Sequence, residues 1–498
     1  MKGYILSIDQ STSGTKAVLF DRWGKLVHRC TFEHFQYYPQ PGWVEHDAEE
    51  IFRKTLEAIR CVLEESGIPS SEVRVLSITN QRETAVVWDR ITGKPVHHAI
   101  VWQCQRGTGI CNELKTQGFD EPVRRKTGLV LSPYFTAAKV KWILDHVEGA
   151  RQMAQEGRLL MGTVDSWLLW KLTGGRVHAT DYSNASRTQL FNIHELRWDR
   201  ELLDIFTIPE SMMPEVRFSD ELFGVTEAGG ILEQGVPVSG ILGDSHAALF
   251  GQNCFEKGMA KATYGTGSSI MLNIGKKALQ SEKGVVTSLA WGQGGEVEYV
   301  LEGNINCTGA TIKWLVDDLG LIAASREAGE IAPSVENTGG VYIVPAFVGL
   351  GAPYWDSEAR AILCGITRGT RKAHIVRAAE ESIAYQIKDV LDLMAVESGI
   401  QLKELRVDGG PTRDDFLMQF QADILDVAVV RARIEELSAL GSAFMAGLAV
   451  GFWKDREEVK ALRIQDAVFQ SKMDPEDRRQ LYAGWKGAVE RALFKPEI

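Results

Sequence analysis

Short apolar runs alternate with turns rich in Gly, Ser and Thr at the start of the chain. YILSI, AVLF and LVHRC are separated by the turns DQSTSGTK and DRWGK within residues 4–30. Runs of about five residues that are rich in branched side chains and bounded by turn residues predict strands. A second unit of this kind, GMAKATYGTGSSIMLNIG, lies at 258–275. It is the nearest approach to an internal repeat, and it suggests a duplicated domain with a cleft between the two copies.

A helix is predicted after the first of these units. Asp47 is a candidate N-cap, Glu50 would complete a capping box, and Gly67 ends the pattern. The apolar stripe between these ends has helical spacing and consists of Phe52, Leu56, Ile59 and Leu63. The strand VRVLSIT follows, so the order is strand, helix, strand.

The same order recurs in the second half of the chain. A long helix is predicted over 374–398, closed by Gly399, and it is followed by the strand ELRVDGG and a helix through FLMQFQADIL. This alternation predicts an α/β fold in which helices cover a mixed sheet. The 498 residues suffice for two large domains, and we expect one at 1–250 and the other at 251–498.

Composition and charge exclude several classes of protein. With 44% hydrophobic and 24% charged residues, the sequence is that of a globular rather than a disordered chain. The net charge of −11 argues against nucleic acid or an anionic membrane as a partner. The most apolar run, 439–453, is shorter than the roughly 20 residues of a membrane span, so we expect a buried helix there and no membrane span.

The seven cysteines are scattered and form no CxxC pair. We therefore expect neither a disulfide framework nor a thiolate zinc site. This cysteine usage, together with a first segment that lacks the apolar core of a signal peptide, predicts a reduced, cytoplasmic setting.

The turn DQSTSGTK at 9–16 gathers backbone N–H groups and hydroxyls at one place, as phosphate binding requires. Lys16 would add a positive charge, and Asp9 could hold a divalent cation. A Ser/Thr/Gly turn is equally the ordinary turn of a hairpin. The companion turn YGTGSS at 264–269 favours the phosphate interpretation, because two facing hairpins can grip one triphosphate from both sides. Neither segment has the spacing of a Walker A loop or of a Rossmann glycine motif.

Two further segments place polar groups after predicted strands. TNQRETAVVW sets Arg82 beside Glu83, and this pair can bind the hydroxyls of a small polyol, although a surface salt bridge is the alternative. Trp102 would supply an apolar wall for the carbon chain. VDGGPTRDDF at 407–416 has a double glycine before a helix, which lets a ring or a ribose approach the backbone, and a plain strand-to-helix turn fits it equally.

Asp244 lies among small and apolar residues in GILGDSHAALFGQ. A carboxylate in such surroundings is costly without a partner, which indicates a role with a ligand or a hydrogen bond. The alternative is a helix-capping aspartate. His246 is a candidate second polar contact, and a core histidine is the other interpretation of it.

Together these segments resemble the FGGY carbohydrate kinases, and within that family the glycerol kinases. The resemblance extends over nearly the whole chain and includes IDQSTSGTKAV, PGWVEHD, ITNQRET, GKPVHHAIVWQCQR, GTVDSWLLWKLTGGRVHATDYSNASRT, TYGTG, VYIVPAFVGLGAPYWD, LRVDGG and FLMQFQADIL. It implies two actin-like (ribonuclease-H-like) domains that close around the substrates. It also implies ATP and Mg²⁺ as cofactors, a polyol or sugar as the small-molecule partner, and a homo-oligomer, either dimer or tetramer.

The resemblance further implies a role for each matching residue. Asp244 matches the general base that takes the proton of the substrate hydroxyl. Arg82, Glu83, Tyr134 and Asp244 match the polyol-binding set, and Trp102 matches an apolar wall of that pocket. Further candidate substrate contacts are Ser245, His246 and Ser269. Thr12, Ser13, Gly14 and Lys16 match the first phosphate loop, with Asp9 near the magnesium. In the second domain Thr266, Gly309 and Gly410 match nucleotide contacts, and Lys313 and Asp414 are candidate contacts at positions that depart from the pattern.

Several positions depart from the glycerol-kinase pattern. Ser245 stands where a glutamine that contacts glycerol is usual, and Ser269 stands where a phenylalanine packs on the glycerol carbons. Loss of that ring removes on the order of 100 Å² of apolar wall and leaves room for another hydroxyl or carbon. Lys313 and Asp414 replace amide side chains near the nucleotide. GGILEQG lacks the arginine of the loop that binds a regulatory sugar bisphosphate, so we expect no such regulation.

The predicted reaction is ATP-dependent phosphorylation of a primary hydroxyl of glycerol or a slightly larger polyol or sugar. A pentulose or tetritol kinase, acting on xylulose, ribulose or erythritol, is the alternative within the family. A non-catalytic actin-like ATP switch is the alternative outside it, and such a protein would have no reason to gather Arg82, Glu83, Tyr134 and Asp244 in one place.

Overall fold

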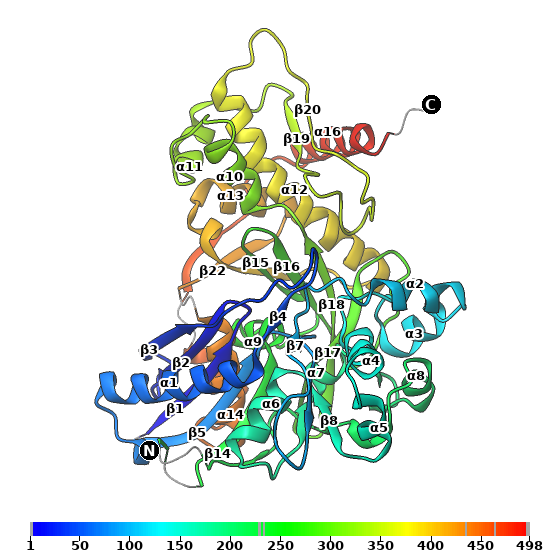
Figure 1. The fold of residues 1–498 in the computed structure, drawn as a ribbon. Coiled ribbons are helices and arrows are strands. Elements are labelled where there is room, and N and C mark those ends of the chain that lie inside the picture. The colour runs from blue at the N-terminus through cyan, green and yellow to red at the C-terminus, as the bar shows by residue number, and fades with distance from the viewer. Residues whose placement is uncertain (1–2, 228–230, 233–234, 434–435, 463–464, 495–498) are drawn as a thin grey trace.

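The computed structural model describes residues 3–227, 231–232, 235–433, 436–462 and 465–494. Two mixed sheets dominate it, one in each half of the chain, and helices pack around both (Figure 1). The first sheet has the order β13-β14-β5-β1-β2-β3, and its strands are Gly224–Val225, Pro237–Gly243, Val73–Asn80, Tyr4–Gln10, Gly14–Phe20 and Leu26–Glu33. The second has the order β17-β18-β16-β15-β21-β22-β23, with strands Val286–Gln293, Glu296–Ile305, Ser268–Gly275, Met259–Tyr264, Glu404–Asp408, Ala428–Ala432 and Gln465–Phe469.

The two sheets share one strand pattern. In the first, β1 pairs antiparallel with β2 and parallel with β5. In the second, β15 pairs antiparallel with β16 and parallel with β21. Each half therefore starts with a hairpin whose first strand lies in the middle of a mixed sheet. This is the duplication that the two turn-rich units predict, and the α/β class is confirmed.

The long helix of the second half covers its sheet. α12, Lys372–Ser398, ends at Gly399, whose φ of 65° is the left-handed cap that the sequence predicts. Its buried face packs in one core with side chains of β15, β16 and β18. Around it stand α10 (Gly309–Asp317), α11 (Glu327–Ile331) and α13 (Asp415–Leu425), as Figure 1 shows.

The remaining elements form smaller units between and beside the sheets. The helices are α2 Thr108–Thr116, α3 Asp120–Thr127, α4 Thr136–His146, α5 Ala150–Gln155, α6 Val164–Leu172, α7 Tyr182–Ala185, α8 Arg200–Ile205, α15 Arg456–Leu462 and α16 Pro475–Leu493. The short strands are β4 Glu45–His46, β6 Val86–Asp89, β7 Ala99–Ile100, β8 Leu159–Gly162, β9 Ala179–Asp181, β10 Phe191–Asn192, β11 Arg197–Trp198, β12 Glu215–Arg217, β19 Tyr342–Val344 and β20 Ile362–Cys364.

The first long helix, α1 (Ala48–Ser66), has the ends that the sequence predicts. The Asp47 carboxylate accepts a hydrogen bond from the backbone N–H of Glu49, and Gly67 closes the helix at a φ of 67°. The predicted capping box is wrong in its second half. The Glu50 carboxylate accepts from the backbone N–H of Phe35, because the chain leaving β3 passes beside the first turn of the helix.

One helix from the second half packs on the first sheet. α14, Leu437–Ala449, lies against β1, β5 and β14, and against α9, Asp244–Gly251. A Cβ on Gly441 would lie 1.8 Å from the carbonyl oxygen of Ala247, so the two helix backbones touch only because that residue is glycine. The Ser442 hydroxyl hydrogen bonds to those of Ser7 and Ser77, at 2.8 and 3.0 Å.

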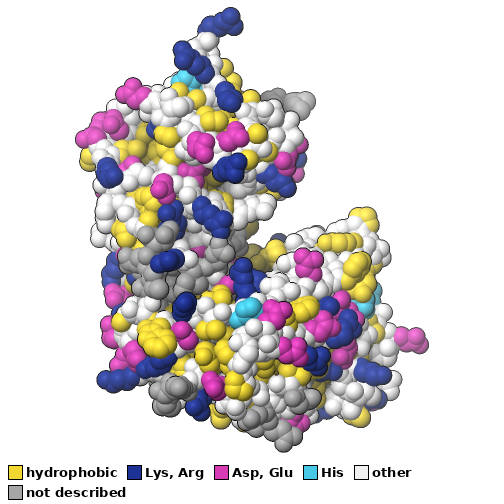
Figure 2. All heavy atoms as spheres, turned by 90° about the vertical axis from the view of Figure 1, so that its left-hand side faces the viewer, with side chains coloured by type: hydrophobic (Ala, Val, Ile, Leu, Met, Phe, Trp, Pro, Cys, Tyr) yellow, Lys and Arg dark blue, Asp and Glu magenta, His cyan; other side chains and the backbone are white. Residues whose placement is uncertain are grey.

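The predicted buried helix in the apolar run 439–453 is thus confirmed for residues 439–449, which belong to α14, and this helix also joins the two halves. None of the helices in the described part of the chain combines the length and apolar character of a bilayer span. The segment GGILEQG lies largely outside the described residues. A hollow separates an upper from a lower lobe in the space-filling view (Figure 2).

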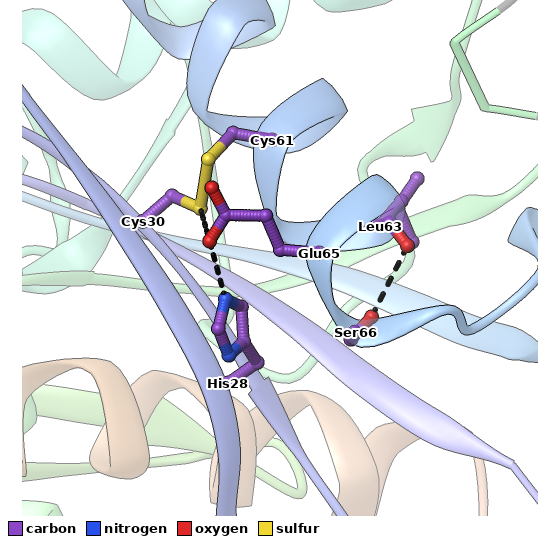
Figure 3. Close-up of a disulfide and its surroundings, with 6 residues drawn as sticks. All are labelled: His28, Cys30, Cys61, Leu63, Glu65 and Ser66. Atoms are coloured by element: carbon purple, nitrogen blue, oxygen red, sulfur yellow. Dashed lines mark hydrogen bonds and ion pairs between the residues drawn. A yellow bond between two sulfur atoms is a disulfide. The ribbon is translucent and has the colours of Figure 1, made fainter.

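The structure corrects the expectation of unpaired cysteines. Cys30 on β3 and Cys61 on α1 form a disulfide with their Cα atoms 6.1 Å apart (Figure 3). Nearby, His28 Nε2 lies 2.8 Å from a carboxylate oxygen of Glu65. The 31-residue spacing of the two cysteines carries no sign of the pairing, because it arises from the packing of α1 on the sheet. The other five cysteines, Cys104, Cys111, Cys254, Cys307 and Cys364, take part in no disulfide.

Candidate active site

A cleft of about 980 Å³ lies between the two halves of the chain. Ten residues predicted for the site line it: Asp9, Thr12, Lys16, Arg82, Glu83, Trp102, Tyr134, Asp244, Ser245 and Ser269. A second cavity of about 820 Å³ is lined by Thr266, Gly309, Lys313, Gly410 and Asp414. Gly265 lines both cavities, so they meet at the turn of the second hairpin. The sequence-predicted residues therefore fall into two adjoining groups.

The turn of the first hairpin closes tightly between β1 and β2. The backbone N–H and the hydroxyl of Ser11 both donate to the carbonyl oxygen of Gly14, at 2.9 and 3.0 Å. The indole N–H of Trp102 donates to the Thr12 hydroxyl at 2.9 Å, which fixes the wall of the cleft to the turn. Ser13 is exposed at the tip. Gly14 is buried, and a Cβ there would lie 2.7 Å from the carbonyl oxygen of Phe32, so its glycine serves strand packing.

The turn of the second hairpin is held by its neighbours in the second sheet. Gly265 accepts hydrogen bonds from the hydroxyl of Thr308 at 3.0 Å and from the backbone N–H of Gly309 at 2.9 Å. Gly409, with a φ of 99°, passes so close that a Cβ would lie 1.9 Å from the carbonyl oxygen of Tyr264. The first glycine of VDGG is thus required by a close backbone approach, whereas a Cβ on Gly410 would meet nothing within 4 Å. Gly410 lines the second cavity together with Thr266 and Gly309.

Asp244 is the first residue of α9 and its side chain is 37% exposed. One carboxylate oxygen lies 3.0 Å from Arg82 Nε and accepts the backbone N–H of Ser245 at 2.6 Å. The N-cap of α9 is Gly243, so Asp244 is not the capping residue of the alternative interpretation. Its other face is turned to the cleft.

Arg82 and Glu83 do not form a salt bridge with each other, so the alternative interpretation of a surface salt bridge is wrong. Arg82 donates to both carboxylate oxygens of Glu302 on β18, at 2.8 and 3.1 Å. Glu83 pairs with Arg187, whose Nε lies 2.6 Å away, and Arg187 Nη1 lies 3.0 Å from Glu302. Four buried charges thus form one cluster behind the cleft. Burial opposes ionisation of Glu302, but the two guanidinium groups outweigh it and hold the pKa of Glu302 well below its usual range.

Sequence reasoning missed Glu302 and Arg187. The available signal was a lone charge within an apolar strand, YVLEGNI, since a buried charge needs a partner. The identity of that partner was not readable, because Arg82 is 220 residues away.

Aromatic and hydroxyl side chains line the rest of the cleft. The rings of Trp102 and Tyr134 meet edge to face, 5.5 Å apart. Arg82 Nη2 donates to the Ser245 hydroxyl at 3.1 Å. The Ser269 hydroxyl oxygen is buried without a hydrogen-bond partner among the described residues, and Ser269 is the ladder partner of Asn304, which also lines the cleft.

His246 faces away from the cleft. Its Nε2 lies 3.0 Å from the Ser288 hydroxyl, and the residue is fully buried. Burial, with Arg82 nearby, lowers the pKa of His246 well below its ordinary value. The core-histidine interpretation is therefore correct, and the predicted substrate contact is wrong: residue 246 lies on the inner face of α9.

Asp9 is 7% exposed at the end of β1, in the same cleft as Asp244. Burial raises the pKa of Asp9 to about 7. The nearby carboxylates of Glu436 and Asp244 also raise this pKa, whereas the positive charge of Lys16 lowers it. Lys16 Nζ lies 3.9 Å from Asp9 and 2.6 Å from Glu436. A buried carboxyl close to two others suits a magnesium ion, which prefers oxygen ligands and would offset their repulsion.

The second cavity carries the two residues that depart from the amide pattern. Asp414 caps α13, accepting from the backbone N–H groups of Phe416 and Leu417 at 2.8 and 3.1 Å. Lys313 is exposed on α10, with Asp317 3.8 Å away. Both side chains line the cavity, and their contacts within the protein do not identify a particular ligand.

Comparison with known proteins agrees with this arrangement. The models for the N-terminal and C-terminal domains of the FGGY family of carbohydrate kinases match residues 4–251 and 260–450. A glycerol kinase of Bacillus mycoides is 55% identical over 98% of this chain and 99% of its own length. A glycerol kinase of Bacillus licheniformis is 54% identical over 99% of both chains.

Solved structures show the same likeness. The Plasmodium falciparum glycerol kinase with ADP superposes with a TM-score of 0.95 at 37% identity, over 99% of both chains. A xylulose kinase of Lactobacillus acidophilus has a TM-score of 0.89 at 22% identity, covering 98% of this chain and 97% of its own, and so shows the shared fold alone. The two-domain α/β architecture expected from the resemblance is confirmed, and the chain belongs to the FGGY family of carbohydrate kinases.

Proposed function

We propose that the protein transfers the γ-phosphoryl group of ATP to a primary hydroxyl of glycerol or a slightly larger polyol. The observation that carries the proposal is the position of Asp244, whose carboxylate faces a cleft that also contains both hairpin turns. The relatives that are 54–55% identical are glycerol kinases, and the P. falciparum glycerol kinase was solved with ADP. These comparisons favour glycerol as the first acceptor to test.

In the proposed reaction Asp244 accepts the proton of the attacking hydroxyl. Arg82, 3.0 Å away, orients that carboxylate and is itself fixed by Glu302. Arg82 and Glu83 bind the other hydroxyls, and the Trp102 and Tyr134 rings cover the carbon chain. Phosphoryl transfer depends on alignment and charge stabilisation, so rigid placement of these groups is what the protein contributes.

The phosphate chain is proposed to lie between the two turns. Thr12, with the backbone of 12–14, would bind it from the first half, and Thr266 and Gly309 from the second. Asp9 would hold magnesium, which neutralises charge on the phosphates when bound. Closing of the two halves around the cleft would exclude water, a competing acceptor.

A tetritol or pentulose is the second candidate acceptor. The Ser269 hydroxyl oxygen, which has no hydrogen-bond partner in the described part of the chain, is buried beside Asn304 of the neighbouring strand, and both residues line the cleft. A further hydroxyl on a four- or five-carbon acceptor would satisfy these groups, whereas the smaller glycerol reaches fewer of them.

A coupled assay of ADP formation tests the proposal, with glycerol, erythritol, threitol, ribulose and xylulose supplied side by side. We expect at least one acceptor to stimulate ADP formation and to yield one phosphorylated product per ADP. ATP hydrolysis that no acceptor stimulates would contradict the proposal and would favour the non-catalytic switch.

Domain boundaries, location and assembly are also proposals. We retain 1–250 and 251–498 as the two domains, and support comes from the division between β14 and β15. We propose a homo-oligomer in the cytoplasm, and the location is supported by the five cysteines that form no disulfide and by the proposed use of ATP. The Cys30–Cys61 disulfide is the one feature that favours an oxidising compartment.

A further inference from the structure

Glu380 is a buried acid that lines the second cavity. It lies on α12 with 3% of its surface exposed, and its Oε2 has no hydrogen bond among the described residues. The next residue is a contrast. Glu381 accepts hydrogen bonds from Arg377 at 2.7 Å and from the Tyr385 hydroxyl at 3.3 Å. Of these two adjacent acids, Glu381 therefore has hydrogen-bond donors within the protein, and Glu380 lines a cavity.

The surroundings of Glu380 favour its neutral form. Burial raises the pKa of Glu380 well above its ordinary value, and the Asp414 carboxylate across the cavity raises it further. A neutral carboxyl group offers one O–H donor and one carbonyl acceptor side by side. A buried polar group left without partners costs free energy, which a bound ligand with matching groups would recover.

The cavity has the dimensions and lining of a nucleoside site. Its volume of about 820 Å³ lies within the range of small-molecule pockets. One end is formed by the phosphate-binding turn proposed above, at Gly265 and Thr266. Apolar side chains that would sandwich a flat ring contribute the rest of the wall: Ile312, Val316, Ile383 and Phe416.

We propose that Glu380 is a specificity-determining residue that reads the adenine base, accepting from its 6-amino group and donating to the adjacent ring nitrogen. This inference rests on the proposed function, because it assumes that the nucleotide phosphates lie at the second turn. Adenine carries this amino group and ring nitrogen next to each other, which matches the donor and acceptor of one carboxyl group. A purine without the 6-amino group leaves the Glu380 carbonyl oxygen unsatisfied.

The test compares ADP with purine riboside diphosphate, which lacks only the 6-amino group. Titration calorimetry measures both affinities without any turnover. We expect the wild-type protein to bind ADP about tenfold more tightly, the value of one buried hydrogen bond. Glu380→Leu should remove most of this ratio. Glu380→Gln should keep it, because an amide also offers one donor and one acceptor in the same place.

Stability and a matched acid provide the controls. Glu380→Leu should not lower the melting temperature, since it replaces an unpartnered buried acid by an apolar group of similar size. Glu397→Gln, near the other end of α12, removes an acid that accepts from Ser281 and backbone N–H groups and should leave the nucleotide ratio unchanged.

The failures of the inference and of the proposed function are distinguishable. An equal affinity of the wild-type protein for the two nucleotides, an unchanged ratio in Glu380→Leu, or tighter binding of GDP than of ADP would overturn the inference. Absence of phosphoryl transfer to any acceptor, with the ADP preference and its loss in Glu380→Leu intact, would overturn the proposed function alone.

Discussion

Arg82 and Glu302 join the two halves of the chain at the floor of the cleft. Arg82 Nη1 lies 2.8 Å from Glu302 Oε2, although the residues are 220 positions apart. Arg82 leaves the end of β5 in the first sheet, and Glu302 projects from β18 in the second. The pair therefore fixes the position of the guanidinium that also holds Asp244, and it couples the orientation of the proposed base to the packing of both sheets.

Removing the charge of Glu302 should destabilise the fold. Glu302→Gln leaves Arg82 and Arg187 with Glu83 as the one fully buried carboxylate of the cluster, and an uncompensated buried charge costs about 3–5 kcal/mol. Urea denaturation measures this loss. Glu296→Gln, an exposed residue at the start of the same strand that pairs with Lys276, is the control and should cost under about 1 kcal/mol. If the free energy of unfolding falls equally in the two variants, the buried charge cluster contributes no more to stability than an exposed ion pair.

Asp244→Asn should abolish most turnover and leave the nucleotide affinity unchanged. The amide keeps the shape of the side chain but cannot take the proton of the hydroxyl, and general-base catalysis contributes roughly 10²- to 10⁴-fold. Steady-state kinetics give kcat, and calorimetry gives the affinity for ADP. A variant that turns over at the wild-type rate would remove Asp244 from the role of base.

Ser269→Phe should shift the acceptor preference toward glycerol. The ring would fill the space beside Asn304 and restore an apolar wall, so kcat/KM for glycerol should rise relative to erythritol and xylulose. Ser269→Ala is the control, because it removes the hydroxyl with little change of volume and should leave glycerol no better placed. If the ratio of the acceptors is the same in Ser269→Phe as in the wild type, residue 269 does not set the size of the pocket.

The contribution of Asp165 to the stability of the protein should fall as the pH rises from about 4 to 7. Burial raises the pKa of Asp165 to about 7 from an ordinary value of 3.8, despite hydrogen bonds from Thr163 and Thr180. The folded state then binds a proton that the unfolded state releases, so the contribution is present below pH 3.8 and is lost through pH 7.

Asp165→Asn tests this dependence, because it removes the titrating group. Between pH 4 and 7 the free energy of unfolding of the wild type should fall relative to that of the variant by up to about 1.4 kcal/mol per pH unit. Chemical denaturation across this range measures the slopes. Parallel pH profiles for the two proteins would be inconsistent with a protonated Asp165 in the native state.

Loss of the disulfide should lower stability under oxidising conditions only. The bridge between Cys30 and Cys61 closes a loop of 31 residues, for which the chain-entropy model gives about 3–4 kcal/mol. Cys61→Ala should therefore unfold at lower urea concentration than the wild type. With dithiothreitol present, the two proteins should unfold together, and a difference that persists in the reductant would assign the effect to packing of residue 61.

The local elements were predictable because their signals are local. The cap at Asp47, the stop at Gly67 and the turn residues at 9–16 and 264–269 act within a few positions of themselves. Asp244 was found in the same way, as a lone acid among small apolar residues. The family resemblance added Tyr134, which no local pattern singles out.

By itself, the sequence determined the α/β class and the two hairpins, since periodicity and turn chemistry depend on near neighbours, and it singled out ten of the residues that line the cleft. Only the tertiary structure decided which charges pair, that His246 faces Ser288, that Cys30 meets Cys61, and that Glu380 faces a cavity without a partner. These contacts join segments from separate strands and helices. Their partners follow from sheet register and helix packing, which a single sequence does not reveal.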